Sequence, residues 1–353
     1  MTSLSESAAE RLVADTAFAP GMPGFVGLAV DLLLDEPVPS ADPGGTPGER
    51  RPLRHGFLTA RSARIVTVSG PPSPGIESSA ARMTEDLRMS LPLIGASAPD
   101  EAAGAAEPGT AGIRVGLEAG VDGAGPYGLG RRWQLAHAVA PVLAAAFANA
   151  PLRHGRPTGW RSVRQALRRD LPSAPPGADP RAAWTALVLD SPSGGHTFRE
   201  LTRRAPADRP GAADLDRHLA ALRPPVAARG HLEIDVADRQ PGDGWLVPLA
   251  VTAALLDDAY AAAEAEHATR PLAGTPRLWE RAARDALTDP ELAAAARECF
   301  VAAYGALARQ GVSREIRDAV AAFTERYVLR GRCPADDVLD RVTRATVIEA
   351  HVE

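Results

Sequence analysis

A single carboxylate lies inside a strongly apolar stretch near the N-terminus. The segment GFVGLAVDLLL, at 24–34, is typical of a buried strand and contains Asp31 between apolar neighbours. A buried carboxylate without a partner is costly, and one acid alone is a poor ligand for Mg²⁺, which needs several oxygen ligands. Asp31 is therefore half of a metal site, the remnant of one, or a strand end that points into solvent.

A second acidic feature is the segment RGHLEIDVAD at 229–238. Its apolar residues alternate with Glu233 and Asp235, so both acids are expected to project from one face of a strand. Two neighbouring carboxylates can bind a divalent cation, but they can also form an ordinary solvated face. Because no third ligand accompanies them, the solvated face is the favoured interpretation.

The densest polar segment is RPTGWRSVRQ at 156–165, which contains three arginines. Arginine binds carboxylate or phosphate through two parallel N–H bonds, and Gly159 would let the backbone approach a ligand closely. The segment predicts a contact to an anionic ligand. The alternative is that Trp160 packs on the core while the arginines lie in solvent or pair with nearby acids.

The overall composition excludes several classes of protein. All 39 basic residues are arginine, so Schiff-base lysine chemistry and a P-loop lysine are excluded. A net charge of −5 gives no general attraction to nucleic acid or to a membrane surface. The N-terminus lacks the pattern of a signal peptide, and the apolar run AHAVAPVLAAAFANA falls short of a spanning helix. We therefore expect a cytoplasmic protein in which Cys299 and Cys333 are reduced thiols.

The elements that must position these residues form no regular βαβ pattern. Strands are predicted at 24–34, 65–68, 113–117 and 231–236, separated by helices and loops. This order predicts an α+β fold around an antiparallel sheet, with a helical C-terminal half packed on it, as one domain over 1–353. Low-complexity composition predicts flexible loops at 36–54 and 96–110. On the strand at 113–117, Arg114 and Glu118 are expected on the same face.

Longer runs of the sequence, in order from about 112 to 340, carry a family resemblance. They are GRRWQLAHAVAPVLAAAFANAPL, RPTGWRSVRQ, DLDRHLAALRPPVAARGHLEI, DRQPGDGWLVPLAVTAALLDD and RYVLRGRCPADDVLD. Less exact counterparts lie upstream, in VGLAVD, VTVSGPP and LPLIGASAP. Together these runs resemble the actinobacterial type 2 glutamate-cysteine ligases of ergothioneine biosynthesis, the EgtA family.

The resemblance implies a glutamine-synthetase-like fold, with a curved antiparallel sheet whose open face binds ATP, Mg²⁺ and glutamate. The family reaction joins glutamate to cysteine through a γ-glutamyl phosphate. By resemblance, Asp31, Glu118 and Glu233 would form the magnesium site. Arg161 and Arg164 would be the catalytic arginines that hold anionic substrate, and Arg114 and Arg161 would contact the nucleotide.

Several family motifs are altered on the sheet. The family patterns G-(L/V)-E-x-E, V-E-L-S-x-P, S-V-Q-V-x-L-D-x-G and L-E-(L/I)-R are changed here at Ala29, Asp31, Thr67, Arg114, Glu118 and Asp235. Loss of two acids and gain of Arg114 makes this face more positive by about three charges, and Asp235 in place of arginine reverses about two of them. Magnesium affinity is expected to fall.

Three hypotheses follow from the sequence. The first is an ATP-dependent glutamate-cysteine ligase with a reduced magnesium site. The second is a non-catalytic homologue that binds a small anionic ligand or partners an intact paralogue. The third is a ligase retuned to another acid or amine, which the position of Arg114 on the open face of the sheet suggests.

Overall fold

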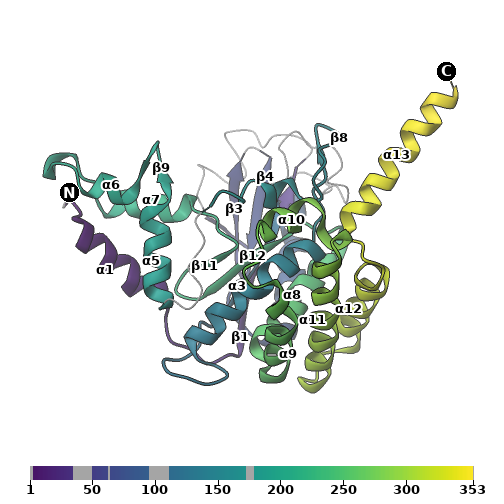
Figure 1. Ribbon diagram of the computed structural model, residues 1–353, viewed down its shortest axis with the longest axis horizontal. Coiled ribbons are helices and arrows are strands. Elements are labelled where there is room, and N and C mark those ends of the chain that lie inside the picture. Colours follow the sequence, from purple (N-terminus) through teal and green to yellow (C-terminus); the bar gives the residue numbers. More distant parts are fainter. Residues whose placement is uncertain (1–2, 35–49, 63, 95–110, 172–178, 353) are drawn as a thin grey trace.

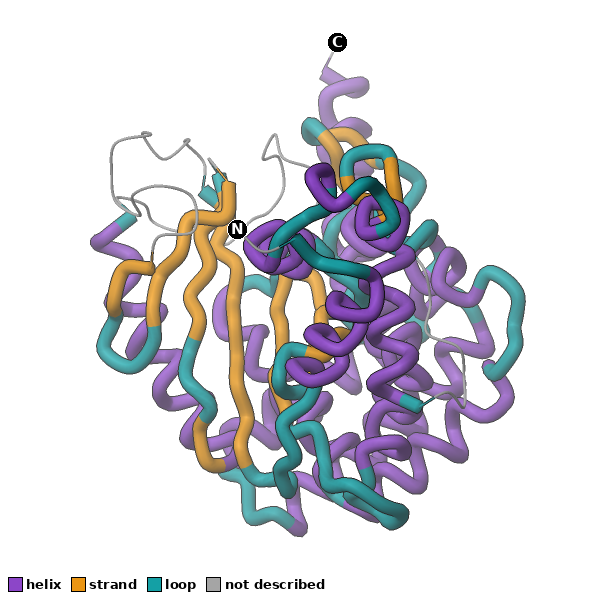
Figure 2. The backbone as a smooth tube through the Cα atoms, turned by 90° about the vertical axis from the view of Figure 1, so that its left-hand side faces the viewer, coloured by secondary structure: helices purple, strands orange, loops and turns teal. Residues whose placement is uncertain are grey.

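The computed structural model describes residues 3–34, 50–62, 64–94, 111–171 and 179–352. Its centre is an antiparallel sheet in the order β11-β12-β6-β1-β4-β3-β2, with β5 paired to the start of β1. Figure 2 shows helices packed behind the strands. The strands of this sheet are β1 (Phe25–Leu33), β2 (Arg50–Pro52), β3 (Phe57–Ser62), β4 (Ile65–Ser69), β5 (Ser73–Pro74), β6 (Gly112–Leu117), β11 (Val226–Ala228) and β12 (Leu232–Asp238).

Strand β1 shows why the sheet has one apolar and one polar face. Val26, Leu28 and Val30 are buried in the hydrophobic core. Ala29 and Asp31, which alternate with them, are on the opposite face because side chains alternate along a strand. Helices α2 (Gly75–Leu93), α3 (Leu129–Ala146) and α8 (Leu246–Asp257) pack against the sheet strands. The polar face is thus left to the arginines and acids.

The C-terminal half is helical, as predicted. Helix α8 is apolar on all sides, which is typical of a helix buried all round, and its residues 247–256 are all buried. The following helices are α9 (Ala259–Thr269), α10 (Leu278–Arg284), α11 (Pro290–Arg309), α12 (Arg314–Arg326) and α13 (Pro334–Val352). Cys299 and Cys333 are both buried free thiols. Helix α13 projects away from the rest of the molecule (Figure 1).

A second group of helices lies at the N-terminal end of the molecule (Figure 1). It consists of α1 (Glu6–Ala17), α5 (Pro180–Asp190), α6 (Phe198–Thr202) and α7 (Ala212–Ala221). Ion pairs from Arg199 to Glu6 and Glu10, both at 2.8 Å, join α6 to α1. Within the described residues, no single helix is long and apolar enough to cross a membrane. The segments Gly242–Asp257 and Ala259–Leu272 are long and apolar enough only when taken together, and they are bent by 97° relative to each other.

The α+β prediction with an antiparallel sheet is confirmed, but some boundaries differ. The predicted loop at 96–110 and most of the loop at 36–54 lie outside the described residues; at 50–52 the prediction is wrong, because these residues form β2 and pair with β3. The last long strand runs to Asp238 rather than Val236. Its register against β6 shifts between Ile234 and Ala237, and such a bulge re-aims the side chains next to it.

Candidate functional site

Asp31 lies at the centre of a buried ion-pair cluster. Its neighbour in register on β4 is Thr67, whose hydroxyl donates to Asp31 Oδ1 at 2.6 Å. Arg114 on β6 donates to both carboxylate oxygens, Nη2 to Oδ1 at 3.0 Å and Nη1 to Oδ2 at 3.1 Å. The backbone N–H of Gly112 also donates to Oδ2, at 3.1 Å. The Asp31 side chain is therefore fully satisfied, with none of its surface exposed.

Arg61 adds a second guanidinium to Asp31. Its Nη1 lies 2.5 Å from Asp31 Oδ2, although β3, which contains Arg61, is two strands away from β1. The β3–β4 register shifts between Ala60 and Ser62, so Arg61 sits in a bulge that turns its side chain across β4. Burial by itself raises the pKa of Asp31, but Arg114 and Arg61 outweigh it and hold that pKa below its usual value.

Asp235 forms a similar cluster on β12. Arg164 in α4 (Val163–Ala166) pairs with Asp235 Oδ1, and Arg168 Nη2 lies 2.5 Å from Oδ2. Burial raises the pKa of Asp235, yet Arg164 and Arg168 together hold it well below its usual value. Asp235 therefore belongs neither to a cation site nor to a solvated face, the two alternatives predicted for Glu233 and Asp235. Its side chain is 1% exposed and is bound by arginine.

Asp238 is the third buried acid in this region. It accepts from the backbone N–H of Asn149 at 2.8 Å and from the Ser162 hydroxyl at 3.0 Å. Arg164 Nη1 is 3.7 Å away. Burial outweighs these contacts and raises the pKa of Asp238 to about 6. The negative charge of Asp238 is therefore expected to decrease as pH falls below neutral.

Glu118 and Glu233, predicted as metal ligands with Asp31, lie elsewhere along the sheet. Glu233 is in register with Gly116, and Gly116 with Gly27, four positions before Asp31. At about 3.3 Å per residue, that offset is about 13 Å along the strands. Glu233 pairs with Arg229 at 3.6 Å.

Glu118 is farther still from Asp31. It follows the end of β6, whose Leu117 pairs with Val26 near the start of β1, and its carboxylate lies against Gly21. Within the described residues, no three His, Cys, Asp or Glu side chains gather closely enough to hold a metal ion. The structure thus does not bring Asp31, Glu118 and Glu233 together, and their joint role stays a prediction.

The surroundings of Asp31 also do not fit Mg²⁺, which the family resemblance implies. A divalent cation at this carboxylate would meet two guanidinium groups and the Thr67 hydroxyl that already fill its lone pairs. Like charges in a buried site repel strongly. A metal ion could bind there only if both arginines moved away.

The two arginines predicted as catalytic point in different directions. Arg164 joins the Asp235 cluster, whereas Arg161 Nε pairs with Asp336 Oδ1 at 2.9 Å and its Nη1 donates to the carbonyl oxygen of Arg284. The backbone N–H groups of Arg161 and Ser162 donate to the Ala283 carbonyl. Arg161 therefore ties the start of α4 to α10 and α13, and its role toward substrate or nucleotide stays a prediction.

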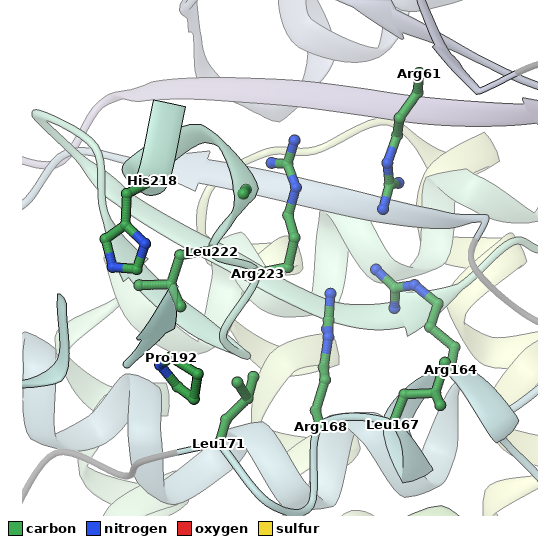
Figure 3. A pocket seen from close by; sticks show the side chains of 10 residues that line it. Arg61, Arg164, Leu167, Arg168, Leu171, Pro192, His218, Leu222 and Arg223 are labelled. Atoms are coloured by element: carbon green, nitrogen blue, oxygen red, sulfur yellow. The ribbon is translucent and has the colours of Figure 1, made fainter. Parts of the chain in front are cut away.

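A pocket of about 380 Å³ opens beside these clusters. Figure 3 shows the guanidinium groups of Arg61, Arg164 and Arg168 pointing toward one another, and Arg223 is the fourth arginine that lines the pocket. The remaining lining residues are Leu167, Leu171, Pro192, His218, Ala221 and Leu222. Its volume is within the usual range for small-molecule sites, about 300–1,000 Å³. The pocket can therefore take a small anion.

Sequence reasoning found Arg164 but missed three of the four pocket arginines. Arg168 follows Arg164 by four residues, a spacing that puts two side chains on one helical face, so a signal for it was present. Arg61 is brought in by a bulge and Arg223 by the return of the chain from α7. No local pattern marks either of these two.

The fold and the site define an α+β protein with an antiparallel sheet and a cationic pocket on its polar face. Residues 110–353 match the family described as glutamate-cysteine ligase family 2. The chain belongs to this family, which confirms the resemblance seen in the sequence.

Two relatives show how far the similarity extends. The chain is 36% identical over 277 residues to the glutamate-cysteine ligase EgtA of Mycolicibacterium smegmatis, an overlap of 72% of this chain and 62% of that relative. It is 30% identical to the EgtA of Mycobacterium tuberculosis, covering 98% of this chain and 92% of that relative. The first alignment thus spans less than two thirds of the mycolicibacterial protein, whereas the second runs nearly end to end.

Proposed function

We propose that this chain is a non-ligating member of glutamate-cysteine ligase family 2, which binds a small anionic ligand through the arginines on the polar face of its sheet. The observation that carries the proposal is the pairing of Asp31 with Arg114 and Arg61. A carboxylate expected by resemblance to hold Mg²⁺ is instead neutralised within the protein.

The energetics of this ion pair favour the proposal. Removing one partner from a buried ion pair costs about 3–5 kcal/mol, because the other charge is left uncompensated. A metal ion at Asp31 would have to break two such contacts and then sit beside the displaced guanidinium groups. Phosphoryl transfer from ATP depends on metal ions that neutralise the phosphate charge, so loss of this site would remove the ligase chemistry.

The second candidate is the reaction for which the relatives are named, ligation of glutamate and cysteine by way of a γ-glutamyl phosphate. It is favoured by the identity to the EgtA proteins. It requires ATP and Mg²⁺ to bind beside Asp31, Glu118 or Glu233, which do not gather into one cluster in the described chain. A ligase that uses another acid or amine would need the same metal and nucleotide.

An ADP-release assay distinguishes the candidates. The purified chain is incubated with ATP, Mg²⁺, glutamate and cysteine, and γ-glutamylcysteine is measured by mass spectrometry, with the Mycobacterium tuberculosis relative as the positive control. We expect no product and no ADP above background. Product from this chain that disappears in Arg164→Ala would establish the ligase instead, and ADP release with another acid or amine would establish the retuned ligase.

A further inference from the structure

Positive charge exceeds negative charge around the 380 Å³ pocket. The five arginines of the two clusters and the pocket are Arg61, Arg114, Arg164, Arg168 and Arg223, and the buried acids that they meet are Asp31, Asp235 and Asp238. The nearby Glu233 is paired with Arg229. An excess of about two positive charges in a partly buried site favours a ligand with two negative charges.

Two donor groups beside the pocket lack a hydrogen-bond partner among the described residues. Arg223 is half-buried and lines the pocket, and within the described chain it has no hydrogen bond or ion pair. Burial and the charge of Arg114 lower the pKa of Arg223, as expected for a cation that lacks an adjacent counter-ion. The Nε of Arg164, a side chain that is 3% exposed, is buried and has no hydrogen-bond partner in the part of the chain that the structure describes.

The other residues that line the pocket indicate which class of ligand it can bind. Leu167, Leu171 and Leu222 offer apolar contacts, and the described lining contains no Asp or Glu. A buried ammonium group without a carboxylate partner is costly, so an amino acid would be disfavoured. Carboxylates suit planar guanidinium groups, which bind them through two parallel hydrogen bonds.

We propose that this pocket binds a small aliphatic dicarboxylate without an amino group, and that no metal ion takes part. The inference rests on the proposed function, since it assigns the ligand class of the same arginine site. Arg223 would bind one carboxylate directly, and Arg164 and Arg168 would hold the other while they remain paired with Asp235. The apolar lining would contact the methylene chain.

Calorimetric titration of the full chain tests the proposal with three probes: glutarate, glutamate and inorganic phosphate. Glutamate differs from glutarate only by its ammonium group, and phosphate provides negative charge without a carbon chain. We expect glutarate to bind at least about tenfold more tightly than either of the others, with the same affinity in EDTA as in Mg²⁺. This comparison uses the wild-type chain and depends on no variant.

Two variants locate the site. Arg223→Gln is expected to weaken glutarate binding at least about tenfold, because a charge-assisted pair is lost. The control is Arg217→Gln on α7, since Arg217 is highly exposed and forms a local ion pair with Asp214; its effect should stay within about twofold. Equal losses in both variants would overturn the placement in this pocket.

Other outcomes separate this inference from the proposed function. Absence of glutarate binding up to about 10 mM, or equal binding of glutamate or phosphate, overturns the dicarboxylate site while the absence of ligation can still stand. Binding that appears only with Mg²⁺ overturns the metal-free site. Formation of γ-glutamylcysteine in the ADP-release assay overturns the proposed function itself.

Discussion

The guanidinium group of Arg114 on β6 holds both carboxylate oxygens of Asp31 on the neighbouring strand β1, at 3.0 and 3.1 Å. The register that pairs Ala29 with Arg114 places the long arginine side chain diagonally over Asp31. Cross-strand diagonal neighbours are within reach of long side chains. The charges of Asp31 and Arg114 therefore compensate each other within the sheet.

Replacement of Arg114 by glutamine should destabilise the protein. The change leaves Asp31 buried with Arg61 as its remaining cation, so we expect a loss of about 3 kcal/mol, the lower end of the range for a broken buried pair. Urea denaturation measures the free energy of unfolding. Arg314→Ala, which breaks the exposed Arg314–Asp318 pair on α12, should change it by less than about 0.5 kcal/mol. Equal small effects of both changes would contradict a structural role for the Arg114–Asp31 pair.

Asp238 should make stability fall as pH rises through the weakly acidic range. Its folded pKa of about 6 lies above the ordinary 3.8, so the folded state binds this proton more tightly than the unfolded state does. The stabilisation is present below about pH 4 and is lost as pH rises through about 6, with a total of about 3 kcal/mol. The unfolding free energies of wild type and Asp238→Asn, measured from pH 4 to 7, should diverge by this amount. Parallel curves would show that Asp238 does not titrate in this range.

A side chain at Gly112 should disturb the Asp235 cluster. A Cβ at this position would lie 2.3 Å from the Cζ of Arg164, which its ion pair with Asp235 keeps in place. Gly112→Ala is therefore expected to cost about 1–3 kcal/mol, as overpacking does.

The matched control for Gly112→Ala is Gly130→Ala in α3, where nothing lies within 4 Å of the added Cβ. This change should be neutral or stabilising by up to about 1 kcal/mol, because alanine favours a helix more than glycine does. Thermal unfolding followed by circular dichroism compares the two variants. If both melt alike, close packing at Gly112 is not significant.

Magnesium should leave the melting temperature nearly unchanged. A ligand stabilises the folded state only when its concentration approaches or exceeds its dissociation constant, and no cluster of potential metal ligands is present within the described chain. At about 10 mM MgCl₂ we expect a shift below about 1 °C relative to NaCl of equal ionic strength. A larger shift that Asp31→Asn abolishes would place a metal ion at Asp31 after all.

Local patterns were enough to predict β1, β4, β6 and β12, but not β2, β3, β5 and β11. Alternation in AGIRVGLEAG and RGHLEIDVAD places Arg114 and Asp235 opposite the apolar residues of each strand, and both are found on the polar face. For Asp31 the sequence left the surroundings open. The period of two is a property of the backbone itself, so it requires no knowledge of the neighbouring strand. The long runs shared with the glutamate-cysteine ligases likewise predicted the family.

Only the tertiary structure decided which charges meet. Register between β1, β6 and β12 places Asp31 beside Arg114 and far from Glu233, and it depends on pairing between segments more than eighty residues apart in sequence. The bulge at Arg61 and the fold of α4 over Asp235 bring further arginines to the acids. Pairing register and bulges arise from contacts across the whole sheet. The local sequence therefore indicated acids suited to a metal ion, but it did not indicate that arginines of the same chain pair with these acids.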